Sequence, residues 1–188
     1  MIDATLKFLT AMLNEELRTR FAAASDLVAL ESVARDPGAG GEETANRLVL
    51  TLVNIEREGT AGNTGRVYRE EGGVARRAPQ PLNINLIFLL SANFPDQYAD
   101  GLRVLSAGIG AFQARPLFTP QSDPTLPEGI ERLSVEWRDL DLQSIHNLWT
   151  VLGGTYLPSA VYKARMLVVE DGFVGTDVSR ITSTAVET

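Results

Sequence analysis

The chain has 188 residues, of which 44% are hydrophobic and 22% charged, so one globular domain with a sizeable core is expected. Its 24 acidic side chains outnumber 17 basic ones, and the net charge of −7 argues against general affinity for nucleic acid or anionic lipid. The absence of cysteine excludes disulfides, thiolate metal sites and cysteine nucleophiles, and it fits synthesis in the cytoplasm.

The first 21 residues predict an amphipathic helix, with Asp3 placed to cap its start. Glu15 and Arg18 interrupt the apolar pattern, so we do not expect a signal peptide here. The apolar residues recur at helical spacing and comprise Ile2, Leu6, Leu9, Leu13, Leu17 and Phe21.

Two strands are predicted next, each followed by a glycine-rich loop. The first lies in "SDLVALESVA" at 25–34, before the turn-prone "RDPGAGGEE". The second is "NRLVLTLVNIERE" at 46–58, which is rich in residues with high strand propensity. The following "GTAGNTG" lacks the Lys-Ser/Thr pair of a phosphate loop and precedes no helix, so we interpret it as a plain loop.

Residues 66–81 predict a protruding hairpin arm, two short polar strands joined at Gly72-Gly73. Two interpretations of this arm stay open. It is either a solvated hairpin balanced by Glu70 and Glu71, or a docking element for an acidic protein surface. The arm holds the dense basic cluster of the chain, made of Arg66, Arg69, Arg76 and Arg77 around Tyr68.

The stretch "PLNINLIFLLSANF" at 81–94 predicts a central strand. Its apolar run is far shorter than the roughly 20 residues of a membrane helix. Asn83 and Asn85 share a strand face with Ile87 and Leu89, so we expect them to form hydrogen bonds within the sheet rather than to bind a substrate.

A second helix is predicted between Pro95 and Pro116. Gly101, Gly108 and Gly110 each weaken a helix, so we expect close packing against a neighbouring backbone at all three. The predicted core face is Tyr98, Leu102, Leu105, Ile109 and Phe112.

The last third of the chain predicts a proline-rich loop, a strand, a helix and a final strand within 161–170. In the strand "IERLSVEWRDL" the predicted buried positions are Ile130, Leu133, Val135 and Trp137. In the helix "LDLQSIHNLWTVLGG", which a glycine ends, the predicted core face is Leu142, Ile145, Leu148, Trp149 and Leu152. The whole order of elements predicts an α+β sandwich, with a sheet packed against helices.

The tail from 171 to 188 is expected to be extended unless a partner orders it, because it has few large apolar residues. Its apolar side chains are candidates for a protein interface, and they are Phe173, Val174, Val178 and Ile181.

The sequence offers little for catalysis. His146 is the single histidine, which excludes a metal site built on several imidazoles. Paired carboxylates such as Glu56 and Glu58 are more typical of a solvated face than of an acid/base pair. The alternative to an assembly subunit is a small ligand-binding protein or enzyme with an unrecognised site, with a pocket formed around Trp149, Tyr156, Tyr162 and Lys163.

Five segments together resemble a known family. They are "LNEELR", "LVNIEREGT", "PLNINLIFLLSANF", "YADGLRVLSAGIGAFQARPLFT" and "LSVEWRDLDLQSIHNLWTVLGGTYLPSAVYKARML". Their order and wording are similar to the tail-terminator, or cap, proteins of extracellular contractile injection systems of the antifeeding prophage and Photorhabdus virulence cassette type. The likeness runs from Met1 to about Val169.

This resemblance implies a tail-terminator-like α+β domain at 1–170 with a mixed or antiparallel sheet, followed by a C-terminal tail at 171–188. It implies a non-enzymatic subunit without cofactor or metal. Such a subunit forms a hexameric ring that ends the inner tube and sheath and couples them, so the implied partners are further copies of this chain, the tube protein and the sheath protein. Assembly in the cytoplasm into a phage-tail-like particle, which is then released, is implied as well; nucleic acid and membrane are not implied partners.

Overall fold

The structure is a computed structural model that describes residues 1–33, 44–58, 68–71, 74–77, 82–153 and 155–168. The predicted loops at 35–43 and 59–65 and the predicted tail at 171–188 lie outside the described residues. The helices are α1 (Ile2–Phe21), α2 (Tyr98–Ala114) and α3 (Leu142–Leu152). The strands are β1 (Val28–Leu30), β2 (Arg47–Arg57), β3 (Tyr68–Glu71), β4 (Val74–Arg77), β5 (Leu82–Asn93), β6 (Leu117–Phe118), β7 (Ile130–Trp137) and β8 (Ser159–Val168).

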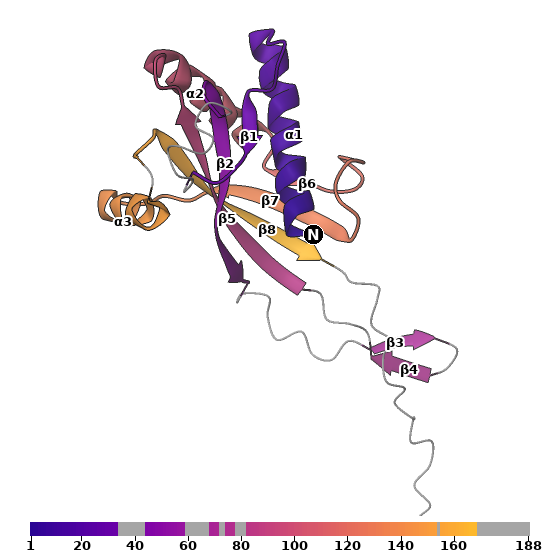
Figure 1. Cartoon of the computed structure of the whole chain (residues 1–188). Helices are drawn as coiled ribbons and strands as arrows, with labels where there is room; N and C mark the ends of the chain where they lie inside the picture. Colours follow the sequence, from indigo (N-terminus) through magenta and orange to yellow (C-terminus); the bar gives the residue numbers. More distant parts are fainter. Residues whose placement is uncertain (34–43, 59–67, 72–73, 78–81, 154, 169–188) are drawn as a thin grey trace, which may run out of the picture.

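Six strands form one curled sheet in the order β1-β2-β5-β8-β7-β6, and this arrangement confirms the predicted α+β class (Figure 1). β1 runs parallel to β2, while every other neighbouring pair is antiparallel, so the sheet is mixed. Residues 82–93 form the long inner strand β5, as predicted for this stretch, with β2 on one side and β8 on the other.

The main core lies between the sheet and the pair of helices α1 and α2. Phe88 of β5 stacks on Tyr162 of β8, with ring centroids 5.4 Å apart, and Phe112 of α2 contacts the same tyrosine at 4.9 Å. The apolar stripe predicted for the first helix supplies the other wall, where Leu9, Leu13 and Leu17 are completely buried.

A smaller core lies on the opposite face of the sheet, under α3. Alternation along β5 sends Ile87 and Leu89 to this side, where they join Val161 of β8 and Trp149 of α3. The molecule therefore has three layers, with α1 and α2 on one face of the sheet and α3 on the other.

The start of α1 differs from the expectation. Met1 occupies the N-cap position of the helix. Asp3, which was predicted to be the cap, lies within the first turn of the helix instead. The Asp3 carboxylate instead accepts hydrogen bonds from the terminal amine and from Lys7. The backbone amide of Ala4 lowers the pKa of this carboxyl, as expected for an acid beside a helix N-terminus.

The buried face of α2 was predicted only in part. Leu105 and Phe112 are buried, but Tyr98 is 63% exposed and Leu102 is 38% exposed. The buried positions include Gly101 and Gly108, so the helix turns its small residues toward the sheet and lies close to it.

Close packing is found at two of the three glycines, but against side chains and not against a neighbouring backbone as predicted. A Cβ on Gly101 would lie 2.9 Å from the Phe94 Cβ, and one on Gly108 would lie 3.1 Å from Leu48 Cδ1. The prediction for Gly110 is wrong, since the nearest atom to a Cβ there is Arg20 Nη1, at an ordinary 3.9 Å.

Two further large apolar residues were wrongly assigned to the core. Trp137, at the end of β7, is half exposed and touches Tyr162 by its edge. Leu142 is 86% exposed because it occupies the first turn of α3, which extends beyond the sheet. The other predicted positions of α3 do face the sheet, and Gly153 ends the helix with a φ of 66°.

Candidate assembly surfaces

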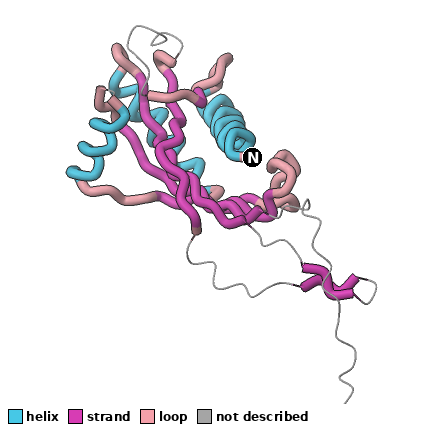
Figure 2. The backbone as a smooth tube through the Cα atoms, turned by 60° about the horizontal axis from the view of Figure 1, so that its bottom comes forward, coloured by secondary structure: helices cyan, strands magenta, loops and turns pink. Residues whose placement is uncertain are grey.

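The hairpin arm is present as predicted, as β3 and β4 in a two-stranded sheet of their own. Figures 1 and 2 draw this hairpin apart from the six-stranded sheet. Tyr68, Arg69, Arg76 and Arg77 all belong to its strands, so the fold brings these four candidate interface residues together. The other candidates lie outside the described residues, namely Arg66, Phe173, Val174, Val178 and Ile181.

The backbone register of the hairpin pairs Tyr68 with Arg77 and Arg69 with Arg76. Glu70 and Glu71 pair with Ala75 and Val74, so neither glutamate is the register partner of an arginine.

The sheet face under α3 carries a chain of ion pairs in the half that α3 leaves uncovered. Lys163 of β8 lies 3.9 Å from the Glu56 carboxylate and 3.8 Å from that of Glu58. Arg165 bonds Glu136 at 3.0 Å, and Arg138 bonds Glu56 at the same distance. Acidic and basic groups alternate from the end of β2 across β8 to the end of β7, so Glu56 and Glu58 both belong to this chain of ion pairs.

Asn85 of β5 lies in the same region and is 1% exposed. Its Nδ2 donates to a carboxylate oxygen of Glu58 at 3.0 Å, so the prediction of hydrogen bonding within the sheet is confirmed for this residue. Its Oδ1 has no hydrogen-bond partner among the described residues. The Asn83 side chain lies outside the described part of the chain.

A groove of about 360 Å³ runs between α3 and the outer part of the sheet. Apolar side chains form its floor and walls, and Glu56 and Arg138 stand at its rim. Beside it, β1 pairs with β2 only as far as Leu50, and no described strand pairs with the outer edge of β2 beyond that point. The groove and the free strand edge form one continuous surface.

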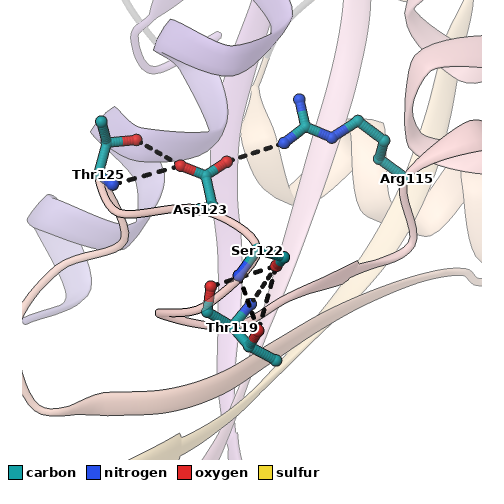
Figure 3. A network of polar contacts seen from close by, with 5 residues as sticks. All are labelled: Arg115, Thr119, Ser122, Asp123 and Thr125. Carbon is teal, nitrogen blue, oxygen red and sulfur yellow. Dashed lines mark hydrogen bonds and ion pairs between the residues drawn. The ribbon is translucent and has the colours of Figure 1, made fainter.

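A second groove, of about 730 Å³, lies between α1 and the loop that follows β6. Figure 3 shows the polar contacts that hold this loop: Asp123 accepts from Arg115 at 2.8 Å and from the Thr125 hydroxyl at 2.7 Å. Thr119 and Ser122 exchange further bonds at the turn. The wall of this groove is therefore fixed by the chain's own contacts.

The structure contradicts the alternative pocket. Tyr162 and Lys163 are neighbours on β8, so their side chains lie on opposite faces of the sheet, Tyr162 in the main core and Lys163 in the ion-pair chain. Trp149 does contact Tyr156, with ring centroids 5.7 Å apart, but on the α3 side only. These four residues do not form one site.

Neither a metal cluster nor a membrane helix is found in the part of the chain that the structure describes. No group of three or more His, Asp or Glu side chains there could hold a metal ion. No helix there is long and apolar enough to cross a membrane. His146 is exposed on α3, and its backbone carbonyl accepts a hydrogen bond from the Thr150 hydroxyl.

Comparison with known families gives one match over almost the whole chain. The model of the family described as the Pvc16 N-terminal domain matches residues 4–183. A comparison with curated protein sequences gives no match.

Two solved structures share the fold. The first is a sheath/tube terminator, in the extended state, of the extracellular contractile injection system PVC, with a TM-score of 0.63 and 19% identity. It aligns with all of this chain, which spans 64% of the terminator's length. The second is the tube-terminating cap of the anti-feeding prophage, with a TM-score of 0.58 and 16% identity over 95% of this chain and 59% of the cap.

Proposed function

The chain belongs to the Pvc16 N-terminal domain family, and from this membership we propose that it is a structural subunit that terminates the tube and sheath of a contractile injection particle. The observation that carries the proposal is the likeness of the entire chain to a sheath/tube terminator, together with the match to the family at residues 4–183. The chain spans 64% of that terminator's length, and every statement below about its role in the particle is part of the proposal.

Further parts of the proposal concern the assembly. Six copies form a ring on the last ring of the inner tube, and the ring couples the sheath to the tube. A closed ring satisfies the sides of each subunit by head-to-tail contacts and leaves two chemically different faces. One face then binds the tube, and the other offers no place for another tube ring.

The physical features that support this role are surfaces rather than a reaction centre. The hairpin stands apart from the sheet, the outer edge of β2 beyond Leu50 lacks a strand partner among the described residues, and a groove adjoins that edge. Free strand edges and projecting arms are typical of subunits that are completed by neighbours. We assign the chain no catalytic step and no cofactor. In this proposal the particle assembles in the cytoplasm and is then released from the cell.

The domain proposal is that residues 1–170 form the terminator-like unit and that 171–188 are a tail ordered by neighbouring subunits. The apolar residues Phe173, Val174, Val178 and Ile181 would then be covered only in the assembly. A chain truncated after residue 170 is expected to fold normally. It is expected to assemble poorly, because it lacks the tail. A truncated chain that assembles as well as the full one would contradict this part alone.

The test is to assemble particles with and without this chain and to measure their lengths by electron microscopy. Without the chain, tubes and sheaths are expected to vary widely in length and to lack a distinct end structure. Adding the chain back should restore one length and one capped end, and labelled chain should occur only at that end. Particles with unchanged length and ends in its absence would refute the proposal. Native mass spectrometry of the purified chain tests the hexamer separately.

A further inference from the structure

The outer edge of β2 is open over its second half. β1 pairs with β2 only as far as Leu50, and the described chain stays beside this edge up to Thr51, whose hydroxyl accepts from the Val33 amide. No described strand pairs with this edge at residues 53–57. An open strand edge presents backbone donors and acceptors to any extended segment, so folded proteins usually cover or blunt such edges.

The groove of about 360 Å³ between α3 and the sheet adjoins this open edge. Its α3 wall includes Leu148 and Val151, and Val151 is 85% exposed although its side chain is apolar. The charged groups at the rim, Glu56 and Arg138, neutralise one another across 3.0 Å. The groove therefore favours an apolar occupant whose own charges are balanced.

An open edge beside an apolar groove is the arrangement to which an extended peptide binds by adding a strand to a sheet. Backbone hydrogen bonds along the edge supply the affinity, and side chains that enter the groove supply the specificity. The occupant must therefore be rich in strand-forming residues, and it must lack proline, which has no amide to donate.

One segment of this chain outside the described residues meets these requirements, namely "FVGTDVSRI" at 173–181. Five of its nine residues are Phe, Val, Thr or Ile, which favour strands, and none is proline. Its two charged residues, Asp177 and Arg180, have opposite signs. In composition and in charge the tail therefore suits the edge and the groove.

The topology of the sheet favours the tail of another copy over the copy's own tail. β2 ends at Arg57, β5 begins at Leu82 and β8 ends at Val168, all at the same end of the sheet. To reach the outer edge of β2 from β8, a tail has to cross the connection that joins β2 to β5 at that end. Connections rarely cross at one end of a sheet, so the open edge is better suited to a tail from outside.

We propose that residues 173–181 of one copy bind as an added strand along residues 53–57 of β2 in a neighbouring copy, with apolar side chains in the groove beside α3. The inference rests on the proposed ring and names the surface that orders the tail within it. In a head-to-tail ring each copy meets the next through the same pair of surfaces, so every tail finds one groove.

The chain contains no cysteine, so single introduced cysteines test this contact. One full-length copy carries Asn147→Cys, at an exposed position in the groove wall, and the other carries one cysteine within 173–181. Mixed in solution and on tube ends, the two copies are expected to form a disulfide with each other. His146→Cys, which is exposed on α3 outside the groove, is the matched control and should give at least about tenfold less.

A pair of charge variants tests the chemistry of the groove. Val151→Glu, added to the copy that carries Asn147→Cys, puts a charge in the groove wall at a position too exposed to disturb the fold. It should lower the disulfide yield at least about tenfold. Leu142→Glu, at an equally exposed position of α3 outside the groove, should leave the yield unchanged. Equal yields from the two variants would overturn the inference.

Hydrogen exchange tests the added strand itself. The amides of residues 53–57 are expected to gain protection when the copies associate, and unchanged exchange there would overturn the inference. A disulfide that forms only within a single chain carrying both cysteines would place the tail on its own copy. That result would overturn the inference as well, as would equal yields from Asn147→Cys and His146→Cys.

The two proposals fail in different ways. Disulfides between copies without control of tube length would leave the tail contact standing and refute the terminator role. Control of tube length without such disulfides, both in solution and on tube ends, would refute the tail contact and leave the terminator role standing.

Discussion

The side chain of Asn14 in α1 acts as a strand partner for Val28 in the edge strand β1. Its Oδ1 accepts from the Val28 amide at 2.8 Å and from the Leu27 amide at 2.9 Å, while its Nδ2 donates to the Val28 carbonyl at 2.9 Å. One buried amide thus satisfies three backbone groups and joins the first helix to the edge of the sheet.

Replacing Asn14 with Ala is therefore expected to lower the free energy of unfolding by about 2–4 kcal/mol, because buried backbone groups lose their partners. Chemical denaturation followed by circular dichroism measures the change. The control is Asn147→Ala on the exposed side of α3, where the lost bond to Gln143 is solvent-accessible and the cost should be small. Equal costs at both positions would contradict the assigned role of Asn14.

The glycines of α2 allow a matched comparison. Gly101→Ala brings a Cβ to 2.9 Å from the Phe94 Cβ and is expected to destabilise the fold by at least about 1 kcal/mol. Gly110→Ala meets only Arg20 Nη1 at 3.9 Å and should stabilise the fold by up to about 1 kcal/mol through helix propensity. Thermal unfolding of both variants tests this opposite sign. Two shifts in the same direction would show that the helix does not lie as close to the sheet as described.

Tyr162 predicts a loss of stability at alkaline pH. Burial raises the pKa of its phenol above the ordinary value of 10.0. Above pH 10 the unfolded chain loses this proton more readily than the folded chain, so the free energy of unfolding falls as the pH rises, whereas below pH 10 the contribution is fully present. The variant Tyr162→Phe should lose this part of the pH dependence, which denaturation at several pH values measures.

The same variant should also change stability at neutral pH. The Tyr162 hydroxyl is buried and has no hydrogen-bond partner in the described part of the chain. Removing it is expected to raise the free energy of unfolding by about 1 kcal/mol. Tyr156→Phe is the control, because Tyr156 is 61% exposed, and it should change neither quantity. A strong loss of stability in Tyr162→Phe would reveal a partner for the hydroxyl.

Asp141 is expected to hold the first turn of α3. Its Oδ1 accepts from the Ser144 amide at 2.7 Å, and this backbone bond lowers the pKa of the carboxyl from 3.8. Asp141→Ala should speed hydrogen exchange at Ser144 and its neighbours, whereas Asp141→Asn should preserve the protection. The stabilisation is present above the ordinary pKa and is lost as the pH falls through the lowered one. Unchanged exchange in Asp141→Ala would show that the cap is dispensable.

Strands and helices followed from the sequence wherever one face of an element is buried. In α1 the stripe through Leu9, Leu13 and Leu17 is wide and regular, so its position was predictable. In β5 the unbroken apolar run correctly indicated a strand covered on both faces, because helices lie on both sides of the sheet.

Hydrophobic size misled the prediction where small residues form the packed face of a helix. In α2 the larger residues Tyr98 and Leu102 face outward because Gly101 and Gly108 occupy the contact with the sheet. In α2 the spacing of the small residues, rather than that of the large ones, indicates the buried face. Trp137 and Leu142 do fit the apolar periodicity of their strand and helix. Each lies at an end of its element that the neighbouring layer does not cover, and this depends on the three-dimensional arrangement alone.

The polar contacts were the least predictable part of the surfaces. Glu56 with Glu58 and Lys163 with Arg165 each show a spacing of two, typical of one strand face. Only the sheet order shows that the two pairs lie on either side of β5, where their charged side chains meet. The register of the hairpin likewise could not be fixed from the cluster of arginines.

The inner position of β8 affects how the protein is made. β8 is the last of the described strands along the chain, and it lies between β5 and β7. Until residue 168 has left the ribosome, β5 exposes one full edge and β7 has no long partner. A ribosome that stalls before Ser159 therefore releases a chain with open strand edges, which is prone to aggregation and to capture by chaperones and proteases. Only chains translated past the last strand can enter the pool of finished subunits.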